Sequence, residues 1–205
     1  MIKLFSGTPG SGKTLHAVHT MDWYNRHKKP VVANFPLRFD MLKHLDLFFL
    51  TSDLVRVYDS KSDKDVTPES IIKFSETYFR NRRVKEGEIL LVLDECQLLF
   101  NSRDWQWNRG WISFFTQHRK YGFDVVLICQ YDRMIERQIR SLIEYECKHL
   151  KVSNLGGIWG LIMPVFLGRF RVYEKWYSVS NMLVSQYRAS YSRRDKKLYD
   201  TFRTW

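Results

Sequence analysis

Residues 7–14, GTPGSGKT, constrain the fold of this chain more than any other stretch of its 205 residues. They match the pattern G-x-x-x-x-G-K-[ST], with a third glycine at Gly10. The mostly apolar residues 2–5 precede the loop, and Leu15 and Val18 follow it at helical spacing. A strand, a glycine-rich loop and a helix in this order are the setting that a phosphate-binding loop requires. The pattern therefore predicts a nucleotide site at the end of the first strand.

The backbone N–H groups of this loop and two of its side chains have separate expected roles in binding the nucleotide. Glycines allow positive φ angles and close backbone approach, so consecutive N–H groups can point at one anion. Lys13 is expected to reach the β- and γ-phosphates, and the Thr14 hydroxyl is expected to ligate Mg²⁺. ATP is the expected nucleotide, although no residue of the sequence visibly selects the base. The predicted nucleotide-binding residues are Gly7, Thr8, Pro9, Gly10, Ser11, Gly12, Lys13 and Thr14.

A second nucleotide motif lies about eighty residues downstream. Residues 89–93 form a continuous apolar run that ends in Asp94 and Glu95. A buried parallel strand carries a terminal acid to the carboxyl edge of its sheet, where the loop also lies. Asp94 is expected to hold the Mg²⁺ as a Walker B aspartate, and Glu95 is expected to polarise a water against the γ-phosphate.

Gln130 closes the predicted strand 124–130, whose residues 125–129 are apolar, and is a further candidate. Its amide can donate to a phosphate and accept from a water, which suits a sensor of the γ-phosphate. A polar residue that merely closes a strand is an equally good interpretation.

Predicted strands and helices alternate along most of the chain, which indicates an α/β fold. We expect a P-loop NTPase three-layer sandwich with a mainly parallel central sheet and antiparallel C-terminal additions, all in one domain, 1–205. The nucleotide-binding core is expected over 1–142, and a strand-rich extension with a basic tail over 143–205. Strands are predicted at 2–5, 30–36, 54–60, 88–95, 124–130, 145–152 and 166–177, and helices after the loop and at 67–83, 110–120 and 133–143.

The charge balance points to an anionic partner without naming it. The chain has 33 basic and 22 acidic residues, a formal net charge of +11. This charge suits a polyanion or an anionic membrane surface, and it also suits a merely solubilising surface. The three cysteines, Cys96, Cys129 and Cys147, have no paired spacing and are expected to be buried, reduced thiols. The apolar run 155–168 is too short and too broken by Gly and Pro for a spanning helix.

Aromatic residues next to arginines offer a possible contact with single-stranded DNA. Trp105 and Trp107 are candidates for such an interface, whereas Trp111 and Phe115, four residues apart, favour the core. The tail 186–203 mixes tyrosines with basic residues, and it could face nucleic acid or an acidic lipid leaflet.

Several of these stretches together resemble the zonula occludens toxin family, the filamentous-phage assembly ATPases of the gene I product type. Besides the loop, they are VVANFPL (31–37), LLVLDECQLLF (90–100) and QHRKYGFDVVLICQ (117–130). The resemblance implies an ATPase at the cytoplasmic face of the bacterial inner membrane that drives phage extrusion. Its implied partners are phage coat and envelope assembly proteins. Family members usually also carry a transmembrane helix and a periplasmic portion, so we expect this chain to be a cytoplasmic portion.

The resemblance also places a basic stretch at His118, Arg119 and Lys120. Ring-shaped NTPases require an arginine that acts on the neighbour's site. Arg119 is our candidate for this finger in a homo-oligomeric ring, with Arg133, Arg137 and Arg140 as competitors. A soluble P-loop kinase and a nucleotide-gated binding module remain the alternatives. The Asp94–Glu95 pair favours hydrolysis over both.

Overall fold

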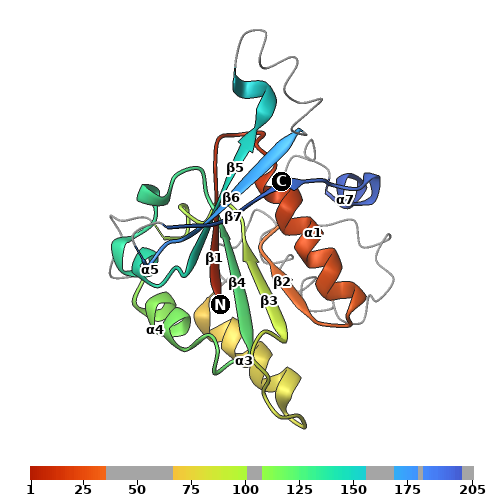
Figure 1. The fold of residues 1–205 in the computed structure, drawn as a ribbon. Helices are drawn as coiled ribbons and strands as arrows, with labels where there is room; N and C mark the ends of the chain where they lie inside the picture. Colours follow the sequence, from red (N-terminus) through yellow and green to blue (C-terminus); the bar gives the residue numbers. More distant parts are fainter. Residues whose placement is uncertain (36–66, 101–107, 156–168, 180–181, 200–205) are drawn as a thin grey trace.

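The computed structural model of the chain describes residues 1–35, 67–100, 108–155, 169–179 and 182–199 (Figure 1). Seven strands form one sheet in the order β2-β3-β4-β1-β5-β6-β7. The strands are β1 (Ile2–Ser6), β2 (Val31–Ala33), β3 (Ile89–Leu93), β4 (Phe123–Ile128), β5 (Tyr145–Lys151), β6 (Phe170–Trp176) and β7 (Met182–Ala189).

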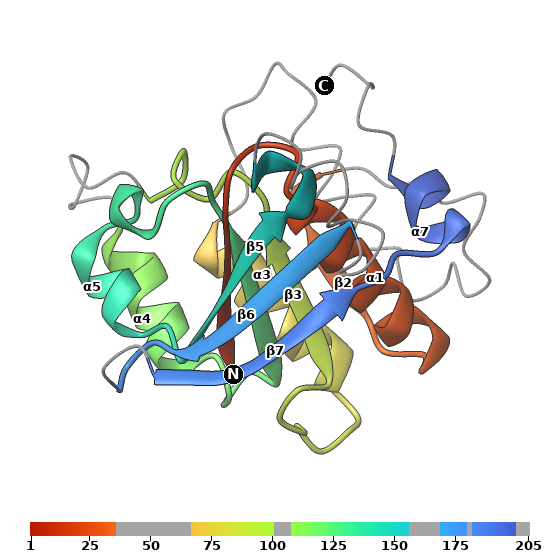
Figure 2. The same ribbon diagram turned by 45° about the horizontal axis from the view of Figure 1, so that its top comes forward.

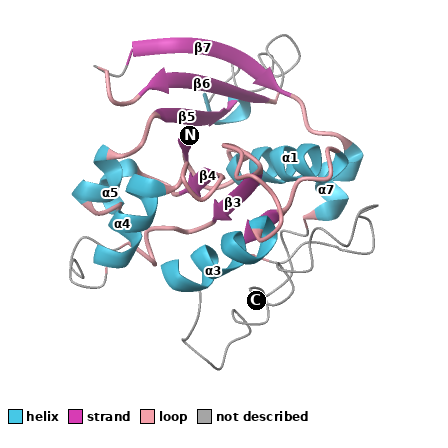
Figure 3. Ribbon diagram, turned by 90° about the horizontal axis from the view of Figure 1, so that it is seen from below, coloured by secondary structure: helices cyan, strands magenta, loops and turns pink. Residues whose placement is uncertain are grey.

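Helices cover both faces of the central strands, as the view from below in Figure 3 shows. One apolar core joins one face to α3 (Pro68–Phe79), α4 (Arg109–Gln117) and α5 (Arg137–Ser141). The other core joins the opposite face to α1 (Lys13–Arg26) and to α7 (Arg193–Leu198). Two short 3-10 turns, η3 (Asp132–Met134) and η4 (Val152–Leu155), follow β4 and β5. The expected three-layer α/β sandwich is confirmed, with one sheet running through all seven strands.

The sequence explains where the helices begin. Thr67 caps α3 through its side chain, which accepts a hydrogen bond from the Ser70 N–H, and Pro68 occupies the first helical position. A threonine cap followed by proline satisfies the free N–H groups of the first turn. α1 begins instead at Gly12, whose φ of 93° and ψ of 14° place it in the left-handed region. Its first N–H groups have no side-chain cap, which leaves them available to an anion.

The parallel part of the sheet includes a strand that the sequence analysis placed outside it. β1 pairs in parallel with both β4 and β5, so its carboxyl end lies between two parallel neighbours. β5, which we assigned to the antiparallel extension beginning at residue 143, is therefore part of the parallel sheet. Among the strands that the structure describes, β6 and β7 alone are antiparallel additions. Figure 2 shows these two strands in front of the remaining sheet.

Several other predictions can be compared with the structure. β7 and α7 were not predicted, because the segment reads as a polar mixture of tyrosines and basic residues. The three cysteines are free and buried, as expected. Trp111 and Phe115 are buried in the core, also as expected. The strand predicted at 54–60, the run 155–168 beyond Leu155, and Trp105 with Trp107 lie outside the described residues.

Candidate functional site

The glycine-rich loop lies between the carboxyl end of β1 and the start of α1. The Gly7 N–H donates to the Gln130 carbonyl over 3.2 Å, which ties the loop to the end of β4. Gly7 has a φ of 139°, and a Cβ built on it would lie 2.4 Å from the His149 carbonyl oxygen. Only glycine fits this position, because both the backbone angle and the close approach of β5 exclude a side chain. The loop is thus held against its neighbouring strands on both sides.

Lys13 folds back over the loop that precedes it. Its Nζ donates to the carbonyl oxygens of Gly7, at 2.7 Å, and Thr8, at 3.2 Å. Burial lowers the pKa of Lys13, while the carboxylates of Asp94 and Glu95 act in the opposite direction. A half-buried ammonium that faces two carboxylates and a curved loop is suited to contact a phosphate chain.

The two predicted metal ligands are in contact. The Thr14 hydroxyl donates to Asp94 Oδ2 over 3.1 Å, although eighty residues separate them in the chain. Burial raises the pKa of Asp94, and hydrogen bonds from the Glu95 N–H and the Thr14 hydroxyl oppose that rise. A hydroxyl and a carboxylate are hard oxygen ligands, and Mg²⁺ is usually held by one or two such groups together with substrate phosphates. The residues present therefore fit this ion.

Asn34 fixes the backbone of Asp94 and was not singled out from the sequence. Its Nδ2 donates to the Asp94 carbonyl over 2.9 Å, and its Oδ1 accepts from the Asp94 N–H over 2.7 Å. The side chain of Asn34 is buried, with 4% of its surface exposed. An asparagine at the end of the apolar run 31–33 was the only available signal. The two bonds replace the sheet pairing that β2 and β3 lose where they end.

Glu95 has a left-handed backbone, with a φ of 47°. Non-glycine residues seldom adopt this conformation, and it is often found at functional sites. The turn exposes the Glu95 carboxylate, which accepts a hydrogen bond from Gln97 Nε2. The Cys96 N–H donates to the Ile128 carbonyl over 3.0 Å and so anchors the turn to β4. Glu95 is therefore presented to solvent beside Asp94.

Gln130 lies directly beside the loop, because its carbonyl accepts the Gly7 N–H. Its side chain is half-buried. This position is compatible with the sensor role, which stays a prediction.

Tyr199, at the end of α7, reaches the predicted metal ligands from the far end of the chain. Burial raises the pKa of Tyr199, the nearby carboxylate of Asp94 adds to that rise, and a hydrogen bond with the Thr14 side chain opposes it. Its ring also packs edge-on against Phe35 at 5.9 Å. The sequence places Tyr199 in a basic tail and offers no signal for this contact. α7 itself is held on α1 by Arg194, which lies 3.2 Å from the buried carboxylate of Asp22.

A pair of histidines, one on α1 and one on β5, lies next to the glycine-rich loop. His16 Nδ1 and His149 Nε2 are 2.8 Å apart, and the His16 ring stacks on Phe5 at 4.4 Å. Burial lowers the pKa of His16 to about 3 and that of His149 to about 4. Both rings are therefore neutral near pH 7, so one nitrogen donates and the other accepts.

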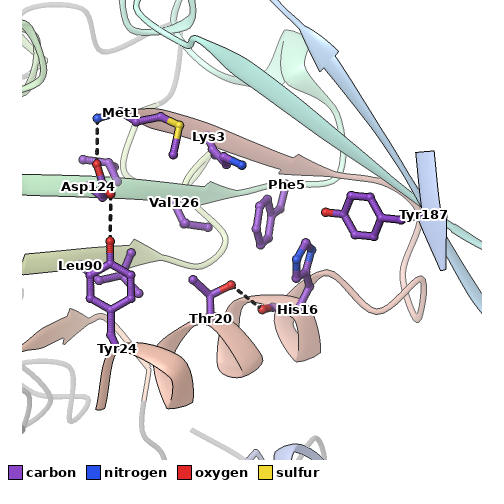
Figure 4. A pocket seen from close by; sticks show the side chains of 11 residues that line it. Met1, Lys3, Phe5, His16, Thr20, Tyr24, Leu90, Asp124, Val126 and Tyr187 are labelled. Carbon is purple, nitrogen blue, oxygen red and sulfur yellow. Dashed lines mark hydrogen bonds and ion pairs between the residues drawn. The ribbon is translucent and has the colours of Figure 1, made fainter. Parts of the chain in front are cut away.

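A cavity of about 150 Å³ lies between α1 and the sheet (Figure 4). His16 and Tyr187 line one end, and Tyr24 and Asp124 line the other. The Tyr24 hydroxyl donates to Asp124 over 2.9 Å. The cavity is distinct from the predicted phosphate site, because no residue of the loop 7–14 lines it.

Arg119 lies at the opposite edge of the sheet from the loop. It follows α4 and pairs with Glu86 at 3.1 Å and with Glu144 at 2.9 Å. These glutamates precede β3 and β5, whereas Asp94 follows β3. Arg119 cannot reach the nucleotide site of its own subunit, and its action on a neighbour stays a prediction. Among the competitors, Arg133 and Arg137 are exposed on the segment after β4.

Comparisons with known proteins agree with this arrangement. A family model described as Zonular occludens toxin (Zot) matches residues 1–197. A protein named "Gene 1 protein" from Escherichia phage If1 is 31% identical over 169 residues, which cover 78% of this chain and 46% of that protein. Its namesake from Salmonella phage IKe is 31% identical over 173 residues, or 82% of this chain and 46% of that protein. The chain therefore spans less than half the length of these curated relatives.

Solved structures share the fold. The N-terminal domain of zonular occludens toxin from Neisseria meningitidis has a TM-score of 0.57 at 16% identity, over 97% of this chain and 98% of that one. B204, the DNA-packaging ATPase from Sulfolobus Turreted Icosahedral Virus, has a TM-score of 0.58 at 15% identity, over 92% and 98%. Within the described part of the chain, no helix combines the length and apolarity needed to cross a membrane.

Proposed function

Because this chain belongs to the zonular occludens toxin family, we propose that it hydrolyses ATP to drive the assembly and extrusion of a filamentous phage. The observation that carries the proposal is the contact between Thr14 and Asp94 beside Lys13, at the carboxyl edge of the sheet. The phage relatives named Gene 1 protein support the assembly context. The fold shared with B204 supports an ATPase.

Each residue of the site has one task in this proposal. The N–H groups of the loop and the Lys13 ammonium bind the phosphate chain and orient it. Thr14 and Asp94 would hold Mg²⁺, which neutralises charge on the phosphate oxygens when bound. Glu95 accepts a hydrogen bond from the attacking water and aims it at the γ-phosphate. Gln130, beside Gly7, contacts the γ-phosphate and acts as a sensor of whether it is present.

The proposal extends to location and partners. We place the protein at the cytoplasmic face of the bacterial inner membrane, working as a homo-oligomeric ring with Arg119 acting on the neighbouring subunit. Phage coat proteins and envelope assembly proteins are its proposed partners. The net charge of +11 supports an anionic partner, either single-stranded DNA or an acidic lipid surface.

Substitution of Glu95 tests the mechanism. Glu95→Gln keeps the shape of the side chain but removes the base, so Mg-ATP binding should be retained while turnover falls by about two or more orders of magnitude. Lys13→Ala should instead lose nucleotide binding. Glu76→Gln is the matched control, because Glu76 is an exposed glutamate on α3, away from the loop. Phosphate release and binding of a fluorescent ATP analogue measure the two steps.

The outcomes separate hydrolysis from its alternatives. Equal turnover in wild type, Glu95→Gln and Glu76→Gln would exclude the proposed role of Glu95. Tight nucleotide binding with negligible turnover in the wild type would favour the nucleotide-gated module. Transfer of the phosphoryl group to a small acceptor would favour the kinase.

A further inference from the structure

One face of the β5–β7 strands carries an unexplained group of cations. In the sheet register Leu4 lies beside Glu146, and Ser6 lies beside Lys148. Leu4 belongs to the core under α3, α4 and α5, so Glu146 and Lys148 point to that side of the sheet. The antiparallel pairing continues the same face across β6 and β7. We call this set the cationic face: Glu146, Lys148, Leu150, Arg171, Tyr173, Lys175, Leu183, Gln186 and Arg188.

The cationic face is open to solvent at several points. Lys148, Gln186 and Arg188 are exposed, and Arg171, Tyr173 and Lys175 are half-buried. β6 and β7 extend beyond the helices that cover the central strands (Figure 3). The face carries four cations and a single carboxylate, Glu146, which already accepts a hydrogen bond from the Ser6 hydroxyl.

Three of these cations, Lys148, Arg171 and Lys175, lack the carboxylate partners that usually stabilise a basic cluster in the described part of the chain. Among the residues that the structure describes, Lys148, Arg171 and Lys175 form no ion pair, and the Arg171 Nε has no hydrogen-bond acceptor. Like charges on one sheet face repel each other unless an anion lies between them. A basic cluster in which three cations have no carboxylate partner therefore indicates an external anion.

The opposite face of the same strands differs. There the Lys3 Nζ lies 2.7 Å from Glu174 Oε1, and the Ser185 hydroxyl donates to the other oxygen of Glu174. Cys147 and Val172 on that side are fully buried. Lys3 is therefore balanced within the protein. The opposite face adds only Lys151, at the end of β5, so the larger excess of positive charge lies on the cationic face.

The arrangement of the cations suits a chain of phosphates. Residues two apart on a strand point to the same face and are about 6.6 Å apart, so Arg171 and Lys175 are separated by about 13 Å along β6. Arg188 pairs with Arg171 across the strands, and Lys148 pairs with Tyr173 between the two ends. Lys148 also lies beside Ser6, the residue before the glycine-rich loop. The cations thus form a track whose middle, Lys148, lies in register with the residue that precedes the glycine-rich loop.

We propose that the cationic face binds single-stranded nucleic acid, with Lys148, Arg171, Lys175 and Arg188 contacting phosphates and Tyr173 stacking on a base. Successive bases of a single strand are free to stack on aromatic rings, whereas those of a duplex are not. This site deepens the proposed assembly function by naming its polyanion and the surface that holds it. Binding at this face does not require hydrolysis.

A lipid surface is the less suitable partner. Large apolar side chains, which a bilayer contact favours, gather toward the turn between β6 and β7. There Trp176, Val179, Met182, Leu183 and Val184 are exposed. The Arg171–Arg188 pair lies at the other end of the hairpin. A flat membrane that received the turn would leave that pair without a partner.

The test compares two double variants that remove the same charge. Lys148→Gln/Arg188→Gln neutralises two exposed cations of the cationic face. Lys73→Gln/Arg80→Gln neutralises one exposed lysine and one exposed arginine in the region of α3. Both lower the net charge of +11 by two. The probe is a fluorescent oligodeoxythymidine, titrated at several salt concentrations with the nucleotide absent, and thermal unfolding checks that each variant is folded.

The cationic-face variant should bind on the order of tenfold more weakly, and its slope of log affinity against log salt should fall by about 1.4, for two lost phosphate contacts. The α3 variant should match the wild type. Tyr173→Leu should weaken binding by about fivefold or more, while Tyr173→Phe, which keeps the ring, should not.

Three results would overturn the proposal. Equal losses in both double variants would mean diffuse attraction by net charge. If the wild type shows no detectable binding to the oligonucleotide at low salt, nucleic acid is excluded as the partner of this face. Binding to phosphatidylserine vesicles that depends on Lys148 and Arg188, without binding to the oligonucleotide, would assign the face to a lipid surface. Lys13→Ala should bind the oligonucleotide normally, so a failure of the ATPase proposal is distinguishable from a failure of this one.

Discussion

Asn34 offers a direct test of whether the acid at the end of β3 is held in place from outside its own strand. Both hydrogen-bonding groups of its side chain contact the backbone of Asp94, at 2.9 and 2.7 Å. Asn34→Ala removes both contacts and leaves the Asp94 N–H and carbonyl without partners. We expect the variant to be less stable and to bind Mg-nucleotide more weakly than nucleotide alone, because the Asp94 carboxylate loses its fixed position.

The cost follows from the two groups left unpaired. A buried donor or acceptor without a partner costs about 1–3 kcal/mol, so the two together should cost roughly 2–6 kcal/mol of the free energy of unfolding. Water can replace the side chain only in part, since Asn34 is 4% exposed. Such a loss is a large share of the stability of an ordinary domain, about 5–15 kcal/mol.

A second buried asparagine supplies the matched control. Asn25 on α1 is fully buried, and neither its Nδ2 nor its Oδ1 has a hydrogen-bond partner among the described residues. Asn25→Ala removes the same atoms without breaking a bond, and alanine is the better helix former, so its cost should be near zero. Urea unfolding measures both variants, and a fluorescent ATP analogue with and without Mg²⁺ measures the site. Equal destabilisation of the two variants, or an unchanged Mg²⁺ effect in Asn34→Ala, would refute the proposed clamp.

Two further experiments address the histidine support and the ring. Burial holds the pKa of His149 at about 4, below its ordinary value of 6.5, so unfolding takes up a proton as pH falls through this range. The wild type should therefore lose about 2 kcal/mol more stability than His149→Gln between pH 7 and pH 5 in urea unfolding, and parallel losses would contradict the assignment. If Arg119 acts on a neighbour, specific ATPase activity should rise with protein concentration or on a hexameric scaffold, and Arg119→Ala should abolish the rise without changing nucleotide affinity. Activity that stays flat under both conditions would argue against the ring.

The parts of the site that were predictable are those encoded in short, continuous segments. The loop 7–14 and the acid after the apolar run 89–93 carry their structural setting in the neighbouring residues, and the structure brings Thr14 and Asp94 together as expected. Asn34 and Tyr199 could not be found in this way. Their partners lie sixty or more residues away, and only the folded sheet and the α1–α7 contact bring them close.

The direction of β5 was missed for a related reason. Parallel strands are normally covered on both faces and read as continuous apolar runs. β5 instead alternates buried Cys147 and His149 with Glu146 and Lys148, a pattern typical of an antiparallel strand with one solvated face. The alternation arises because β5 lies where the helical cover of one face ends. The alternation in the sequence correctly predicts that one face of β5 is exposed. It does not indicate whether the strand is parallel or antiparallel to its neighbour.

The central position of β1 determines when this domain can form during synthesis. β1 comes first along the chain, yet its two neighbours are β4 and β5, so Phe5 lies beside Ile128 and Cys147. The ribosome must deliver roughly 150 residues before β1 has both partners, and until then its apolar side chains and unpaired backbone are exposed to other chains. Contacts of such long sequence separation are also slow to form. The segment that holds the phosphate loop is thus translated before both of its neighbouring strands and is enclosed only after β5. It therefore stays exposed for longer than a strand that pairs in order of synthesis.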